Sequence, residues 1–170
     1  SQIYDRCDLT RSYDQTPYTT VVNGFSINTA RLSELLCPSS DDINSGFVTG
    51  ITTHVYGVLG PRGSNPAGGT YGFYDDQASP QTGPSQGWIP KQGILGVNES
   101  IPLSRVSDGT STTLLIGELS WRGSGCYRPW TRGWDGNAAA SAKSTIYAIN
   151  STLYNGSSNF NHVTFGSNHS

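Results

Sequence analysis

The sequence contains no methionine, few charged residues and no long hydrophobic run, and these absences exclude several classes of protein. Charged residues make up 13% of the 170 residues, and the formal net charge is −2. No cluster of Lys and Arg provides the positive surface that a nucleic-acid-binding protein needs. No run of 18 apolar residues is present, so no stretch is long enough to form a transmembrane helix. The chain is therefore predicted to bind no nucleic acid and to contain no membrane span.

The sequence also lacks the common motifs of metal and catalytic centres. The cysteines have no Cys-x-x-Cys spacing, which argues against a zinc site or a thioredoxin-like redox pair. The histidines have no His-x-x-x-His or His-Glu pairing, which favours structural roles for them. These residues are Cys7, Cys37, Cys126, His54, His162 and His169. No Gly-x-Ser-x-Gly elbow, His-Glu-x-x-His motif or P-loop is found. We expect a protein that is not an enzyme and has no obligatory cofactor.

The polarity of the chain comes from uncharged residues. Ser, Thr and Asn are abundant, and the chain has 21 glycines and 9 prolines. This composition favours a loop-rich β protein over a helical one. The length suits one domain. We predict a single domain over residues 1–170, of mostly β or α+β class, with an antiparallel sheet and long Gly/Pro/Ser-rich loops.

The clearest strand signal follows a turn at Asp108 and Gly109. Gly adopts positive φ at little cost, while Asp and hydroxyl side chains bond back to the local backbone. The β-branched and aliphatic residues 112–116 then fit a buried strand. Because apolar residues occupy both faces of this segment, we predict a central strand covered on both sides, with Leu115 in the core.

Other elements are predicted from shorter patterns. Residues 28–36 place three leucines on one helical face and are followed by Pro38, so a short helix is expected there. Residues 47–59 indicate one or two strands with a bulge at Gly50. Further strands are expected at residues 145–149 and 160–165, and a long surface loop containing a short hairpin at residues 60–92.

Several segments resemble a known family. Residues 106–118, Val-Ser-Asp-Gly-Thr-Ser-Thr-Thr-Leu-Leu-Ile-Gly-Glu, resemble the central signature of the planctomycete pilin-like family. Its members carry a type II secretion pseudopilin-type N-terminus and a largely uncharacterised globular domain. Shorter pieces in the family's order are residues 3–5, the Cys-Pro-Ser at 37–39, residues 55–60, and residues 165–169 of the closing motif.

The resemblance implies a location and a role. It suggests the globular domain of a longer protein, without that protein's N-terminal hydrophobic helix and C-terminal end. The expected protein is extracytoplasmic, at the cell surface or secreted. It would be a non-enzymatic subunit of a filament or secretion-type assembly, with copies of itself as partners. Membrane contact would occur only through the missing helix.

The resemblance also bears on the cysteines. The oxidising environment of an exported protein favours disulfide formation. The cysteine of the family's Cys-Pro-Ser motif generally has no fixed partner. We therefore expect Cys7 to pair with Cys126 and Cys37 to remain a thiol. Pairing of Cys7 with Cys37, or three reduced thiols, are the alternatives.

Two residue groups are candidate binding sites. The first interleaves aromatic and Arg side chains, which suits sugar stacking; a lid of aromatics over one end of the core is the alternative. Its members are Trp121, Tyr127, Arg128, Trp130 and Trp134. The second is a candidate calcium site at Asp108 and Glu118, because this chain resembles pseudopilins and some pseudopilins use calcium. The strand between these two carboxylates would span about 20 Å, which favours a turn-stabilising role for Asp108.

Two other functions are kept as alternatives. An extracellular carbohydrate-binding module with a polysaccharide as its partner is suggested by the Trp/Arg cluster and by the aromatic residues in the long loop. A small secreted hydrolase is the third hypothesis, because the members of a catalytic triad can be scattered along a sequence.

Overall fold

The computed structural model describes ten parts of the chain, and everything said below about structure concerns them. They are residues 21–22, 25–44, 50–74, 89–96, 99–107, 109–120, 128–131, 134–135, 138–151 and 164–167. Within these ranges no helix combines the length and the apolar character needed to cross a bilayer.

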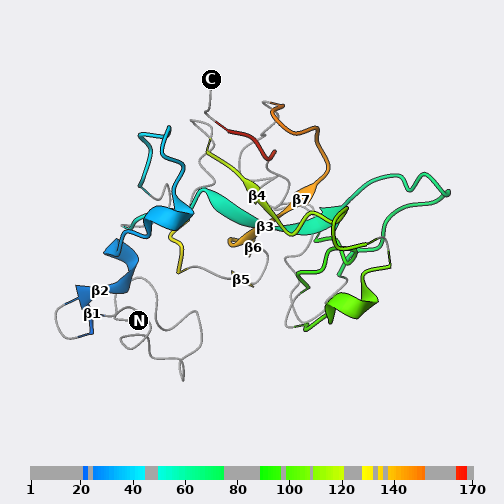
Figure 1. Cartoon of the computed structure of the whole chain (residues 1–170), viewed down its shortest axis with the longest axis horizontal. Helices are drawn as coiled ribbons and strands as arrows, with labels where there is room; N and C mark the ends of the chain where they lie inside the picture. The colour runs from blue at the N-terminus through cyan, green and yellow to red at the C-terminus, as the bar shows by residue number, and fades with distance from the viewer. Residues whose placement is uncertain are drawn as a thin grey trace.

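A small mixed sheet forms the centre of the molecule (Figure 1). Strand β3 (Val55–Pro61) lies in the middle. It pairs antiparallel with β4 (Ile116–Glu118) on one side and parallel with β7 (Ala142–Thr145) on the other. The mostly β class is confirmed. The sheet is not purely antiparallel, however, because β3 and β7 run in the same direction.

The other regular elements are short. Two-stranded ribbons are formed by β1 (Val21–Val22) with β2 (Phe25–Ser26) and by β5 (Trp134–Asp135) with β6 (Ala138–Ala139). Three single-turn 3-10 helices are η3 (Ile27–Thr29), η4 (Ser33–Leu35) and η5 (Leu103–Arg105). Most of the described chain is therefore loop, as the Gly/Pro/Ser-rich composition predicts.

The core is built on β3. Tyr56, Val58 and Leu59 of this strand are buried. Leu59 belongs to a cluster with Ile89 and Ala142, so the core joins β3 to β7 and to the loop before residue 91. Burying one large apolar side chain contributes about 1.5–3 kcal/mol. The sheet is consequently stabilised mainly along its central strand.

A bulge at Leu59 bends β3. Val58 pairs with Lys143 while Gly60 pairs with Ser144, which leaves Leu59 as the extra residue. Gly60 has φ +101°, and the Gly93 N–H donates to the Leu59 carbonyl at 2.9 Å. A Cβ on Gly93 would lie 2.4 Å from the Leu59 carbonyl carbon. Glycine is therefore needed where the loop crosses the bulge.

The predicted bulge at Gly50 is wrong. Gly50 lies in a bend outside the named strands. It is close-packed instead, since a Cβ there would lie 3.1 Å from the Asn28 Cβ and 3.3 Å from the Pro129 ring. This glycine therefore permits close approach of two loops, which is a different use of the same small residue.

The predicted central strand at residues 112–116 is also wrong. Strand β4 has only three residues and lies at the edge of the sheet. Leu114, Leu115 and Ile116 are 59%, 45% and 60% exposed. The preceding residues form the predicted turn, with φ +87° at Gly109. The Gly109 carbonyl accepts hydrogen bonds from the Thr112 N–H at 3.2 Å, the Thr112 hydroxyl at 3.0 Å and the Thr113 hydroxyl at 2.9 Å.

The predicted helix over residues 28–36 is replaced by η3 and η4. Leu32 between them is extended, with φ −106° and ψ 101°. The carbonyls of Asn28 and Leu35 accept hydrogen bonds from Ile51 and His54, both at 2.7 Å. A helix of nine residues is marginal on its own. Backbone bonds to the segment that leads into β3 therefore stabilise the extended alternative.

The remaining predicted elements are partly confirmed. A short hairpin in the 60–92 loop is present, with a bridge between Ser64 and Thr70. The strand predicted at 145–149 lies earlier, at Ala142–Thr145, where it pairs with β3. Of the strand predicted at 160–165, only residues 164–165 are described; the bridge that follows joins Leu119 to Gly166.

Candidate functional site

Motifs that are far apart in the sequence meet around β4. The Cys37 N–H donates to the His54 imidazole at 2.9 Å, which links the Cys-Pro-Ser segment to the start of β3. The Gly166 N–H donates to the Glu118 carbonyl at 2.9 Å. The Phe165 ring covers Gly117, because a Cβ there would lie 2.5 Å from it. Residues 3–5 and 168–170, including His169, lie outside the described residues.

His54 has a structural role at this junction. It is fully buried, and burial lowers the pKa of its imidazole below 6.5, against the opposing influence of Asp42 and Glu118. Because Nδ1 accepts the Cys37 N–H, the ring proton belongs on Nε2, which donates to the Asp42 carbonyl at 2.8 Å. Neutral His54 therefore joins two turns of the chain. His162 lies outside the described residues.

Glu118 connects β4 to the segment at residues 164–167. One carboxylate oxygen accepts hydrogen bonds from the Ser120 hydroxyl at 2.7 Å and the Ser167 hydroxyl at 3.1 Å. Among the described residues no group of three His, Cys, Asp or Glu lies where it could hold a metal ion. Asp108 lies outside them, so calcium binding by Asp108 and Glu118 stays a hypothesis.

Two apolar grooves adjoin β4. The first has a volume of about 300 Å³ and is lined by residues including Leu114, Ile116, Ile149 and Phe165. The second also has a volume of about 300 Å³ and is lined by residues including Leu36, Cys37, Pro38, Val55 and Ile116.

Ile116 therefore lines both grooves. We call the exposed Leu114, Leu115, Ile116 and Ile149, together with these grooves, the β4 surface. Exposed apolar side chains grouped on a sheet edge suit a protein partner better than a polar substrate.

The Trp/Arg cluster is only partly described. Trp121 and Tyr127 lie outside the described residues, and of Trp134 only the backbone, in β5, is described. The Trp130 indole N–H donates to the Ala30 carbonyl at 2.8 Å, and the Arg128 carbonyl accepts from the Thr52 hydroxyl at 3.0 Å. These contacts tie residues 128–131 to the chain before β3; sugar stacking and the lid both stay hypotheses for the cluster.

The three cysteines are also only partly described. Cys37 is a buried thiol, as expected from the Cys-Pro-Ser resemblance. Cys7 and Cys126 lie outside the described residues, so the disulfide between them stays a prediction.

One polar pair was missed in the sequence. Lys143 of β7 is fully buried, and its ammonium group lies 5.6 Å from the centre of the buried Tyr56 ring. A lysine within a Ser- and Ala-rich segment carries no local signal of burial.

A family model described as "Protein of unknown function (DUF1559)" matches residues 1–170. No curated protein and no solved structure matches the chain.

Proposed function

The chain belongs to the family described as "Protein of unknown function (DUF1559)", and from this premise we propose that it is a non-enzymatic, extracytoplasmic pilin-like or pseudopilin-like subunit. Copies of the chain associate in a surface filament or a secretion-type assembly. The resemblance of residues 37–39, 55–60 and 106–118 to pilin-like motifs supports this proposal. Contact between copies is through the β4 surface.

One observation carries the proposal: the β4 surface is apolar and exposed. Ile116 is 60% and Ile149 is 62% exposed, and both line the same groove. Removing apolar area from water contributes about 25 cal/mol per Å². An exposed apolar edge is a liability for a solitary domain. The same edge stabilises an assembly when a second copy covers it.

The polar groups beside this surface support a non-enzymatic role. Both ring nitrogens of His54 have backbone partners, and a Glu118 oxygen accepts from two serine hydroxyls. A general base or acid must be able to reach a substrate. These two groups instead hold neighbouring segments together.

The first prediction tests the β4 surface in the full-length protein. Ile116→Lys should reduce the assembled fraction severalfold, because a charge at the centre of an apolar contact must lose its hydration. Leu103→Lys is the matched control, since Leu103 is 66% exposed but lies in η5. Sedimentation and electron microscopy measure assembly, and urea unfolding checks that both variants fold. Normal assembly of Ile116→Lys would contradict the proposal.

A further inference from the structure

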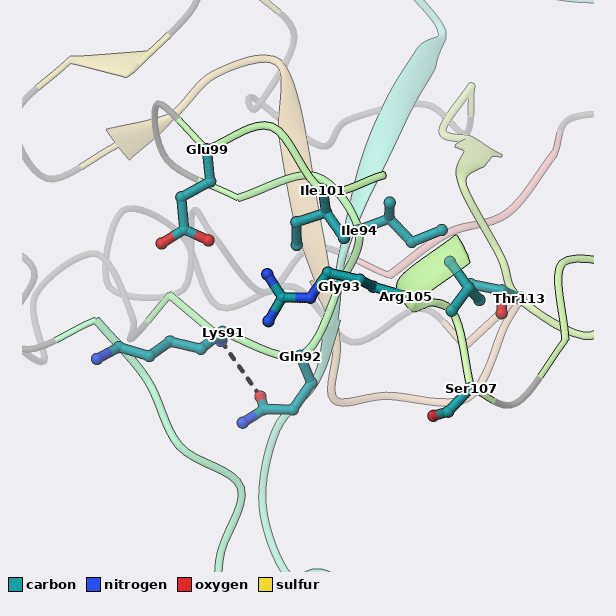
Figure 2. Close-up of a pocket in the computed structure, with 10 residues that line it drawn as sticks. Lys91, Gln92, Gly93, Ile94, Glu99, Ile101, Arg105, Ser107 and Thr113 are labelled. Atoms are coloured by element: carbon teal, nitrogen blue, oxygen red, sulfur yellow. Dashed lines mark hydrogen bonds between the residues drawn. The ribbon is translucent and has the colours of Figure 1, made fainter. Parts of the chain in front are cut away.

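A third groove, distinct from the β4 surface, lies beside the bulge of β3. Its volume is about 370 Å³, within the range of small-molecule sites. Four segments form it: residues 91–94, residues 99–101, the end of η5 with the residues after it, and Thr113 (Figure 2). It does not depend on the proposed assembly.

The backbone around this groove is held in place. The Gly93 N–H donates a hydrogen bond to the carbonyl of Leu59, the bulge residue, at 2.9 Å. The Arg105 N–H donates to the Pro102 carbonyl at 2.9 Å, and the Thr113 hydroxyl donates to the Gly109 carbonyl at 2.9 Å. Walls fixed by such bonds lower the ordering cost of binding a ligand.

The groove carries more positive than negative charge, although the whole chain has a net charge of −2. Its charged side chains are Lys91, Arg105 and Glu99. Figure 2 shows the Arg105 guanidinium pointing toward the space bounded by Glu99 and Gln92. With the described residues that guanidinium makes no hydrogen bond or ion pair. The Lys91 ammonium lies 5.2 Å from the centre of the Tyr74 ring.

Apolar and hydroxyl groups complete the lining. Ile94, Ile101 and Val106 line the same groove as Ser107 and Thr113. A planar guanidinium fits a carboxylate through two parallel hydrogen bonds. Carboxylate, amide and hydroxyl groups pair with the hydroxyls of a sugar, while aliphatic side chains contact the C–H face of its ring. This combination favours a ligand that carries a carboxylate on a pyranose ring.

We propose that this groove binds a hexuronate. The Arg105 guanidinium donates two parallel hydrogen bonds to the carboxylate. Lys91 adds positive charge. Lys91 is followed by Gln92, whose amide NH2 donates to ring hydroxyls while its Oε1 accepts from the Lys91 N–H at 3.2 Å, and the Glu99 carboxylate accepts hydrogen bonds from other ring hydroxyls.

The test uses three probes that separate the parts of the ligand. D-glucuronate carries the carboxylate and the ring, D-glucose carries only the ring, and acetate carries only the carboxylate. In an NMR titration, glucuronate should shift the amide signals of residues 91–94 and 105–107 in a saturable manner, and it should bind at least several times more tightly than the other two. Equal binding of acetate, or of glucose, would overturn the proposal.

Variants then test the role of Arg105. Arg105→Gln should weaken glucuronate binding roughly tenfold or more, since a charged hydrogen-bonded pair is lost. Arg105→Lys should bind with intermediate affinity, because the charge remains but the fork is gone. Arg31→Gln is the control: Arg31 is exposed, lies between η3 and η4, and does not line the groove. Unchanged binding by Arg105→Gln, or an equal loss in Arg31→Gln, would overturn the assignment.

Discussion

At the scale of single residues, the centre of the sheet holds a charge against an aromatic ring. Lys143 and Tyr56 are both fully buried, on adjacent strands, with the ammonium group 5.6 Å from the ring centre. Burying an ammonium group is costly unless it is compensated. The face of an aromatic ring supplies part of that compensation, and its effect grows when water is excluded.

A double-mutant cycle measures this pair. Tyr56→Leu and Lys143→Met each remove one partner while keeping a sizeable apolar side chain. The destabilisation by both changes together should be smaller than the sum of the two single changes, by about 0.5–2 kcal/mol. Urea unfolding of the four proteins gives the coupling. Strict additivity would mean that the ring does not stabilise the ammonium group.

The pH dependence of stability should report on His54. Its pKa in the folded protein lies below 6.5, because burial disfavours the charged ring. At pH values between the folded and unfolded pKa, the unfolded chain binds the proton and the folded chain does not. Stability is therefore full above pH 6.5 and falls as the pH drops through that value toward the folded pKa.

Urea midpoints at pH 7.5 and 5.5 test this second residue-scale prediction. The loss of stability between the two pH values should be smaller in His54→Gln than in the wild type, since His162 and His169 are retained in both. An NMR titration of the His54 ring checks the assignment without a mutation. An equal loss in both proteins would assign the pH dependence to other groups.

At the scale of elements, the central position that was predicted for residues 112–116 belongs to β3. Residues 112–116 have the stronger apolar pattern, yet only Ile116 of this segment belongs to β4, which pairs on one side with β3. Leu114, Leu115 and Ile116 remain exposed. Strand β3 contains two glycines and a proline, yet it pairs on both sides. An apolar run shows that burial of a segment away from water is favourable. It does not show whether the same chain or another molecule buries it.

Two leucine truncations distinguish the strands. Leu59→Ala should cost about 2–5 kcal/mol, through lost transfer energy and a cavity in the core. Leu115→Ala should cost less than about 1 kcal/mol in the unassembled protein, because its side chain is already 45% exposed. Urea unfolding of both variants gives the comparison. A larger loss for Leu115→Ala would restore this segment as the centre of the core.

Local patterns in the sequence were sufficient for some features and not for others. The turn at Gly109 was predictable because its hydrogen bonds join residues within four positions. No local pattern excluded the helix at 28–36. The extended backbone found there depends on a hydrogen bond from the His54 N–H to the Leu35 carbonyl, and these residues are distant in the sequence. The bulge at Leu59 likewise depends on pairing with Ser144 and Lys143.

At the scale of the whole molecule, pieces of chain that are distant in sequence form both surfaces. The resemblance to one family gave the order of the Cys37 segment, β3, β4 and residues 165–167 along the chain, but it did not predict that they meet. The groove at Arg105 has no sequence signal, since its lining comes from four separate segments and its Arg, Lys and Glu have no common spacing.

The cysteine prediction belongs to this scale, because a bridge from Cys7 to Cys126 would close most of the chain into one loop. A non-reducing peptide map should show that bridge together with Cys37 as a thiol, which is buried and should react with iodoacetamide only after unfolding. Reduction should cost about 2–5 kcal/mol. A bridge that contains Cys37 would contradict this pairing.

The parallel pairing of β3 with β7 has a consequence for how the protein folds. Both partners of β3 come later in the chain, at Ile116–Glu118 and Ala142–Thr145. During synthesis the central strand therefore emerges long before either neighbour, with its apolar side chains unpaired. Contacts this distant give a high contact order, for which folding takes on the order of milliseconds to seconds. In that interval a nascent chain is exposed to aggregation at β3, and a chain cut short before residue 142 keeps that hazard permanently.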